Sequence, residues 1–255
     1  MTFASTLINR VSQWSRRKNV NKICVFEKKG SIIWQRQVLL ILLGLWYIQA
    51  TAWAGEPSSY DEFLNHCEGL YNSFDCARAI ERAQAKGKDG VYFRRNDNRL
   101  IIRLASKHIT LRDRDLDQSD TRGYSYITFH PRQKIHVLHL QFYEGEAFVV
   151  IHHLTGELAQ IDGFPIASPD LRRFVAISHG GESGYNPTSI EIWRVRNGHM
   201  WPEYRYESSP WEWGPGSASW LDNNAIHIDG LCLEAERTCE SARLSMKAGR
   251  WRIER

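Results

Sequence analysis

Short apolar strands separated by polar turns fill the chain from residue 91 onward, and this pattern limits its fold more than any other feature. A period of two predicts β-strands. That period is found in the segments 99–104, 109–111, 124–130, 135–143, 147–153, 190–195, 200–206, 243–246 and 250–253. The dipeptides Glu144-Gly145, Thr155-Gly156 and Asn197-Gly198 predict hairpin turns. Many short strands with regularly spaced turns indicate an all-β sandwich, barrel or propeller.

An internal similarity narrows this choice. Residues 130–137 align with residues 168–175 at an offset of 38, and residues 220–227 repeat the pattern more weakly after about 50 more. Each segment is a polar turn followed by an apolar strand. Blades of β-propellers have a repeat of about 40–50 residues, so the spacing favours a propeller-like arrangement.

The turn Ser168-Pro169-Asp170, the basic pair Arg172-Arg173 and the strand 174–178 resemble one blade turn of the S-P-D β-propeller repeats. Residues 190–198 resemble the hairpin that follows in that repeat. The chain also resembles a group of uncharacterised exported bacterial β-rich proteins over most of residues 58–230. The segments that carry this resemblance are 79–81, 143–145, 154–156, 168–170, 184–187 and 213–215. The resemblance implies a fold and an exported location, and it implies no established activity.

The length of the β-rich part limits the number of blades. About 160 residues supply three to four blades, whereas closed propellers typically have at least about four. We therefore expect a mainly β fold of antiparallel meanders, propeller-like and incomplete, or stacked meanders that never close. This body is predicted to span residues 89–255.

A helical hairpin is predicted before the β-rich body, over residues 55–88. Apolar residues recur at three- and four-residue steps from Tyr60 to Leu70, with Ser59 available as a cap. Asn72-Ser73 interrupts the first helix. A second short helix is expected to have Ser73 or Asp75 as its cap and to end at Gly87.

Residues 1–54 have the order of a secretory signal peptide: a basic segment, a short apolar run, and Ala52-Trp53-Ala54 before the cleavage point. Of the 33 Lys and Arg residues, 8 precede Gly55, against 1 of the 29 acidic residues. The part after Ala54 therefore has a net charge of −3, so we predict no nucleic-acid partner. We expect a periplasmic or secreted protein that meets the membrane only through the signal peptide before cleavage.

Four cysteines follow the predicted cleavage point, as the close pairs Cys67 with Cys76 and Cys232 with Cys239. An even number of cysteines in an exported protein predicts disulfides, although four cysteines allow three pairings. We favour the two local pairings, the first of which would join the two predicted helices. A zinc site is the competing interpretation, and the absence of any C-x-x-C spacing disfavours it. We predict no cofactor and no metal.

Two alternatives would make the chain an enzyme. His136 and His153 are expected to face each other across a hairpin, with His139 on the opposite face, and could bind a metal if a third ligand were present. Without that ligand, hydrogen-bonded structural histidines are the favoured interpretation. His179 and Ser183 could belong to a hydrolase, but the segment lacks the G-x-S-x-G spacing and the following helix that this motif requires. Asp113, Asp115 and Asp117 alternate as in a calcium loop but lack its Gly and Glu, so we expect a solvated loop.

An aromatic cluster is the preferred candidate binding site. Tyr204, Tyr206, Trp211 and Trp213 lie within a short proline-rich segment that also contains Trp201. Exposed rings stack on sugars or contact peptides, whereas buried rings would fill a blade core. We predict a non-enzymatic domain of the cell envelope that binds a protein or a glycan through these four residues. An exported hydrolase or metal-dependent enzyme is the alternative.

Overall fold

The computed structural model describes residues 59–114, 121–180, 185–208, 213–231 and 240–255. The predicted signal peptide, the predicted Cys232–Cys239 disulfide, Trp211 and Ser183 lie outside these residues. The compact unit described below is Gly55–Arg255. Within the described residues, no helix has the length and apolar character needed to cross a membrane.

Both predicted helices are present before the strands. The first, η2, is a 3-10 helix over Tyr60–Cys67, and the Oγ of its N-cap Ser59 accepts a hydrogen bond from Asp61 N at 3.1 Å. The second, α2, spans Ser73–Lys86 and ends before Gly87. Its N-cap is Asn72, not Ser73 or Asp75. Asn72 adopts the extended conformation that a cap requires, and its Oδ1 accepts from Asp75 N at 2.7 Å.

A disulfide joins Cys67 at the end of η2 to Cys76 in α2, which confirms this predicted pairing. The two cysteines are nine residues apart, so the bond closes a short loop. It holds η2 against α2, which in turn packs on strand β4. A short 3-10 helix, η3 (Lys88–Val91), leads from α2 into the first strand.

Replacing both Cys67 and Cys76 with serine should lower the free energy of unfolding by about 2–3 kcal/mol, because the unfolded chain regains the entropy of a loop of this length. Chemical denaturation of the oxidised protein and of the double variant measures the difference. Adding a reductant should abolish the difference in stability between the two proteins. Equal stability of the two proteins would contradict a structural role for this bond.

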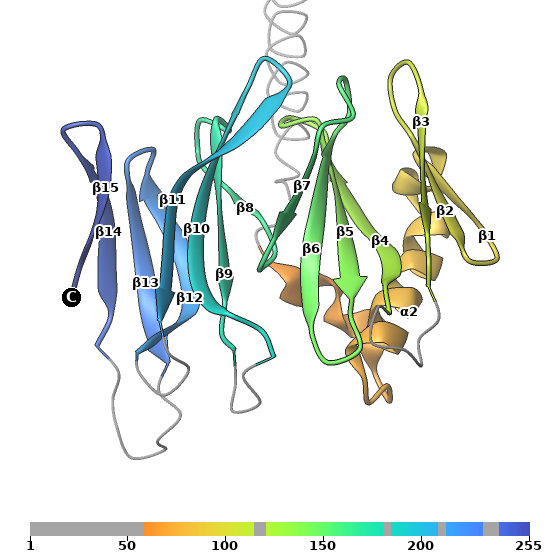
Figure 1. Cartoon of the computed structure of the whole chain (residues 1–255), viewed down its shortest axis with the longest axis horizontal. Coiled ribbons are helices and arrows are strands. Elements are labelled where there is room, and N and C mark those ends of the chain that lie inside the picture. Colours follow the sequence, from red (N-terminus) through yellow and green to blue (C-terminus); the bar gives the residue numbers. More distant parts are fainter. Residues whose placement is uncertain (1–58, 115–120, 181–184, 209–212, 232–239) are drawn as a thin grey trace, which may run out of the picture. The chain divides into compact units, whose positions relative to one another are not determined.

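The rest of the described chain is mainly β, as predicted, and forms four antiparallel sheets (Figure 1). The first sheet contains β1 (Phe93–Asn96), β2 (Arg99–Arg103) and β3 (His108–Arg112). The second contains β4 (Gly123–His130), β5 (Ile135–Gln141), β6 (Glu146–His152) and β7 (Leu158–Ile161). The third contains β8 (Ile166–Ala167), β9 (Arg173–Ser178), β10 (Thr188–Arg196) and β11 (His199–Ser208). The fourth contains β12 (Gly214–Asp222), β13 (Ala225–Leu231), β14 (Ala242–Lys247) and β15 (Arg250–Glu254).

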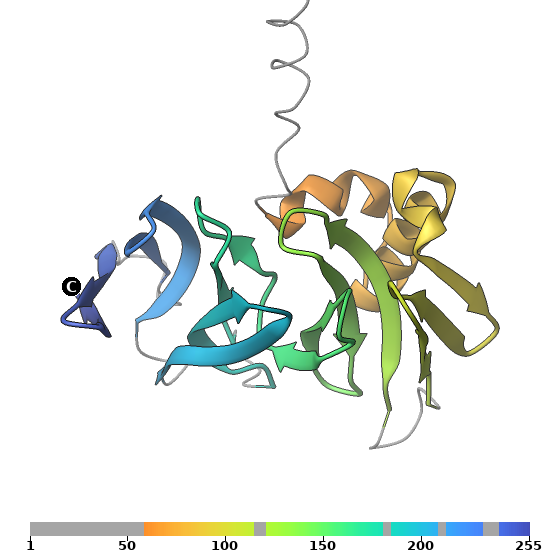
Figure 2. The same ribbon diagram turned by 90° about the horizontal axis from the view of Figure 1, so that it is seen from above.

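Every sheet is a meander in which neighbouring strands are consecutive in the chain. The four sheets follow one another in chain order, and both views show them side by side (Figures 1 and 2). This succession of small meanders, packed face to face, is the propeller-like arrangement that the sequence predicts. The first sheet has three strands and each of the others has four.

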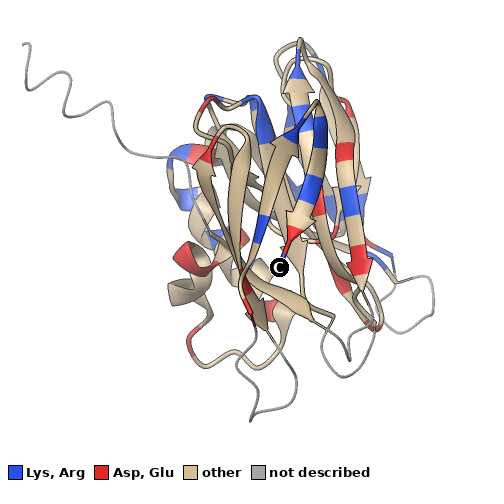
Figure 3. Cartoon of the chain, turned by 90° about the vertical axis from the view of Figure 1, so that its left-hand side faces the viewer, with Lys and Arg blue, Asp and Glu red and all other residues tan. Residues whose placement is uncertain are grey.

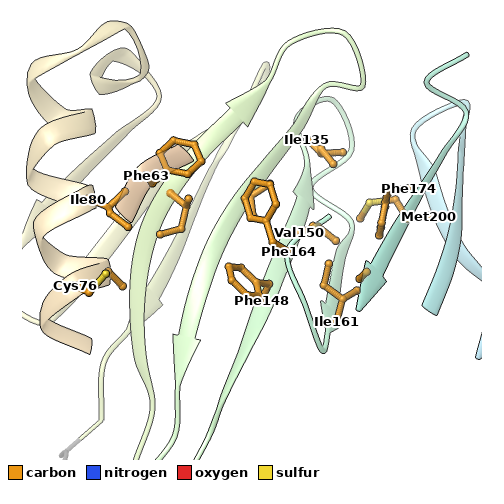
Figure 4. Close-up of a cluster of buried hydrophobic side chains, with 14 residues drawn as sticks. Phe63, Cys76, Ile80, Ile135, Phe148, Val150, Ile161, Phe164, Phe174 and Met200 are labelled. Atoms are coloured by element: carbon orange, nitrogen blue, oxygen red, sulfur yellow. The ribbon is translucent and has the colours of Figure 1, made fainter. Parts of the chain in front are cut away.

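Three clusters of buried apolar side chains join the sheets. One joins the first sheet to the second and includes Leu100, Ile102, Leu138 and Ile151. Another joins the helices, the other face of the second sheet, and the third sheet; Figure 4 shows its members Ile80, Phe148, Phe164 and Phe174. The last joins the third sheet to the fourth and includes Ile190, Ile192, Ile226 and Leu244. Strands such as β5 are therefore buried on both faces, so that polar side chains on them need internal partners.

The three similar sequence segments occupy equivalent places, because each forms the turn between the first two strands of a four-stranded sheet. These turns also contact one another. Gln133 Nε2, in the β4–β5 turn, donates to the carbonyl oxygens of Leu171 and Arg173 at 3.1 and 2.9 Å. Asp170 N, in the β8–β9 turn, donates to Asn223 Oδ1 in the β12–β13 turn at 2.9 Å. Successive sheets are thus joined at the same end by hydrogen bonds between their turns.

Candidate binding groove

The predicted aromatic residues Tyr204 and Tyr206 lie on β11, and Trp213 directly precedes β12. All three are partly buried and pack on the apolar cluster between the third and fourth sheets. The rings of Tyr206 and Trp213 are 6.2 Å apart and edge-on, and the guanidinium of Arg255 lies over Trp213 at 4.5 Å. The structure therefore brings Tyr206 and Trp213 together, with one face of Trp213 covered. Among the described rings of this sequence cluster, Trp201 is the most exposed, at 38%.

The two histidines that could act as metal ligands contact each other directly. His136 Nε2 and His153 Nδ1 are 2.9 Å apart, and His136 Nδ1 is 3.0 Å from the hydroxyl of Tyr126. The partner of His136 in the strand register is Ile151, so the contact reaches diagonally to His153 just beyond β6. Burial, together with the neighbouring histidines, lowers the pKa of His136 to about 3. No group of three potential metal ligands occurs in the described part of the chain.

His139 lies on the opposite face of the strand from His136, and its Nε2 is 2.9 Å from Glu146 Oε2. His179 packs on Gly214, where an added Cβ would lie 2.7 Å from His179 Cδ2. Asp113, expected in a solvated loop, instead forms ion pairs with Arg78 and Arg95 and accepts a hydrogen bond from Tyr124 N at 2.9 Å. Its partly buried carboxylate thus belongs to a structural network, whereas Asp115 and Asp117 lie outside the described residues.

A groove lined by arginine and asparagine side chains lies between the third and fourth sheets, at the end where their turns meet. We call it the arginine groove; its volume is about 730 Å³ and its polar lining comprises Asp170, Arg172, Arg173, Arg194, Arg196, Asn197, Asn223 and Asn224. These residues come from three turns and from the ends of β9 and β10. Figure 3, which faces the C-terminal sheet, shows Lys and Arg positions along the strands nearest the viewer.

Local sequence explains how the groove is built. Asn197 and Gly198 both have positive φ, 53° and 84°, and form the tight β10–β11 turn that the sequence predicts. In the β8–β9 turn, Ser168 Oγ donates to Asp170 Oδ1 at 2.8 Å and accepts from Arg173 N at 3.0 Å. The Ser168-Pro169-Asp170 sequence therefore fixes its own turn and positions the two arginines that follow.

The charges of the groove are only partly balanced. Glu203 accepts from Arg173 Nε at 2.5 Å and forms an ion pair with Arg194. Burial alone would raise the pKa of Glu203, but the hydrogen bonds from Arg173 and Trp251 and the two nearby guanidiniums lower it below its ordinary value. Glu203 is therefore an anion that neutralises part of the charge. Arg172 and Arg196 are exposed at the mouth of the groove.

A second hollow of about 460 Å³ continues from the groove and shares Arg173 and Arg194 with it. Its lining includes the exposed indole of Trp201 and the edge of the buried Trp251. A chain-like ligand could therefore contact guanidiniums and amides in one part and an aromatic ring in the next.

Two pairs of arginines in the sequence belong to this groove, and the aromatic cluster does not include them. The basic pair Arg172-Arg173 follows one predicted turn, and Arg194 and Arg196 precede another. Their proximity depends on how the third and fourth sheets pack, which no local pattern specifies.

Comparisons with known proteins add no family assignment. No family model matches the chain, and no curated protein matches it. Among solved structures, the crystal structure of the N-terminal domain of Nup159 is similar with a TM-score of 0.31 and 9% identity, over 64% of this chain and 47% of that one. The chain thus spans about half the length of that domain.

Proposed function

We propose that this protein is an exported, non-enzymatic binding domain of the cell envelope and that its arginine groove binds an anionic glycan. The observation that carries the proposal is the open groove with Arg172 and Arg196 exposed at its mouth. Export is supported by the leader sequence and by the Cys67–Cys76 disulfide, since disulfides persist in oxidising compartments.

The chemistry of the lining favours an acidic ligand. A guanidinium donates paired N–H groups to carboxylate or phosphate oxygens. In the groove, four arginines face the carboxylates of Asp170 and Glu203, which leaves an excess of positive charge. The Asp170 carboxylate is directed into its own turn, where it accepts from Ser168 Oγ and Arg172 N at 2.8 and 3.1 Å.

Two further features favour a sugar polymer over an acidic peptide. The amide side chains of Asn197 and Asn224 are exposed at the groove and offer both donors and acceptors, which suit sugar hydroxyls. Trp201 is exposed in the adjoining hollow and offers a flat apolar surface on which a sugar ring can stack. An elongated acidic glycan would contact both the arginine groove and the adjoining hollow.

Replacing Arg172 and Arg196 together with alanine should weaken binding of a short oligogalacturonate by about tenfold or more, because charged hydrogen bonds to the ligand are lost. Calorimetric titration at low salt measures this affinity. The matched control is the double replacement of Arg99 and Arg103, two exposed arginines on β2 in the first sheet, which should bind as the original protein does. A neutral malto-oligosaccharide serves as the uncharged probe.

The same titration separates the possible ligands. Trp201→Ala should weaken oligogalacturonate binding about threefold to tenfold, since ring stacking contributes modestly. Tyr143→Ala removes another exposed aromatic side chain and should have no effect. Tight binding of polyglutamate that is insensitive to Trp201→Ala would replace the glycan by an acidic peptide. Equal binding of oligogalacturonate by the Arg172/Arg196 variant would overturn the proposal.

A further inference from the structure

A second cavity, which shares no lining residue with the arginine groove, opens where η2 meets the second, third and fourth sheets. Its volume is about 350 Å³. The residues that matter for its chemistry are Tyr60 of η2, Glu146 and Phe148 of β6, and Asp162 and Phe164 of the loop between β7 and β8. That loop lies tightly on β9, because a Cβ on Gly163 would be 1.9 Å from the carbonyl oxygen of Ile177.

The lining is acidic. Asp61, Glu146 and Asp162 contribute carboxylates, and the described residues that line the cavity include no Lys or Arg. Asp162 is already paired, with Arg205 Nη2 at 2.8 Å and Ser189 Oγ at 2.8 Å. Glu146 accepts from His139 Nε2 at 2.9 Å, and this hydrogen bond, opposed by burial, lowers the pKa of the Glu146 carboxyl. The Glu146 side chain retains 37% of its exposure and is thus an accessible anion.

Aromatic rings form the neighbouring wall. The rings of Tyr60 and Phe148 lie 5.3 Å apart at 76°, and those of Phe148 and Phe164 lie 5.8 Å apart at 83°. Figure 4 shows Phe148 and Phe164 next to each other at this position. Rings that meet almost at right angles present a corner of π-faces, and such corners attract organic cations.

Tyr60 contributes its ring to this wall, and its hydroxyl is buried away from solvent and has no hydrogen-bond partner among the described residues. Burial and, secondarily, the charge of Glu146 raise the pKa of Tyr60 well above its ordinary value, so the phenol stays neutral. The Tyr60 ring therefore gives this wall a neutral aromatic surface.

We propose that this cavity binds a small alkylammonium compound. Its ammonium group donates to the Glu146 carboxylate, and its carbon chain contacts the rings of Tyr60, Phe148 and Phe164. The charged N–H donors of an ammonium suit this carboxylate, whereas a neutral alcohol would gain little from the charge of Glu146. This proposal is independent of the function of the arginine groove.

The test titrates the purified protein with n-pentylammonium and, in parallel, with 1-pentanol, and follows the backbone amide resonances of Gly163 and Phe164 by NMR. We expect the amine to bind more tightly than the alcohol and to shift these resonances. Glu146→Gln should weaken amine binding by about tenfold, because a charged hydrogen bond is lost, and should leave alcohol binding unchanged.

Two residues just after η2 offer matched controls. Glu68→Gln changes an exposed carboxylate at the end of η2, and Tyr71→Phe removes the hydroxyl of a fully exposed tyrosine. Both should bind the amine as the original protein does, and so should Tyr60→Phe, which keeps the aromatic ring. Unchanged alcohol binding shows that each cavity variant keeps its fold. Equal affinity for amine and alcohol, or amine binding that survives Glu146→Gln, would overturn the proposal.

Discussion

Replacing Glu81 with alanine should lower the free energy of unfolding by about 3–5 kcal/mol. Glu81 is 4% exposed. Its Oε2 accepts from Arg95 Nη2 and from Tyr126 N, both at 2.9 Å, and its Oε1 contacts Arg78 at 3.5 Å. The substitution leaves two guanidiniums and a backbone N–H at a buried site with fewer partners.

The reason for this sensitivity is the position of Glu81 between three parts of the fold. Arg78 and Glu81 belong to α2, Arg95 to β1, and Tyr126 to β4, so one carboxylate joins the helix to the first two sheets. Chemical denaturation measures the loss. Arg82→Ala, the next residue along α2 and exposed, is the matched control and should change stability by less than about 0.5 kcal/mol. A similarly small loss for Glu81→Ala would show that this network contributes little.

Acidification should destabilise the protein steeply between pH 6.5 and about pH 4 through two buried histidines. Burial lowers the pKa of His130 to about 4, and burial with the neighbouring histidines lowers that of His136 to about 3. In the unfolded chain each has a pKa near 6.5. Between these values the unfolded state binds more protons than the folded state. Each histidine therefore reduces the free energy of unfolding by about 1.4 kcal/mol for every pH unit lost.

The two histidines lower the stability only as the pH falls below about 6.5. The stabilisation is fully present above pH 6.5, where both rings are neutral in either state, and it is lost as the pH falls toward the folded-state values. Urea denaturation at successive pH values measures the slope. Replacing His130 with glutamine should reduce the slope by about 1.4 kcal/mol per pH unit, whereas replacing the exposed His66 with glutamine should leave it unchanged. A stability that stays constant from pH 6.5 to pH 4.5 would contradict the burial of these rings.

Strand periodicity and turn residues predicted much of the fold. The hairpins at Glu144-Gly145 and Asn197-Gly198 form where the sequence places them. At Asn197-Gly198 both residues have positive φ, which is a local property of asparagine and glycine. The short strands β1 and β8 were not predicted, since a strand of two to four residues has too few positions to show a period. The cap of α2 was misplaced by one to three residues because several neighbouring side chains can cap.

The candidate sites were predicted less completely, and for a physical reason. The aromatic cluster is visible in the sequence, but whether a ring faces solvent depends on which sheet packs beside it. Tyr206 and Trp213 are partly buried against the fourth sheet, whereas Trp201, from the same cluster, is exposed. The arginine groove and the acidic cavity each combine residues that are far apart in the chain, so periodicity and spacing could not assemble them.

The hydrogen bonds between equivalent turns suggest how a protein of this kind can change its size. Gln133 joins the second sheet to the third, and Asn223 joins the third to the fourth, so each of these bonds involves only consecutive sheets. Stability in such an array is approximately a sum over neighbours. Duplication of one unit of about 40 residues can therefore lengthen the array without rebuilding the earlier interfaces. Each added unit would also create a new inter-turn groove, whose ligand preference could evolve separately from that of its neighbours.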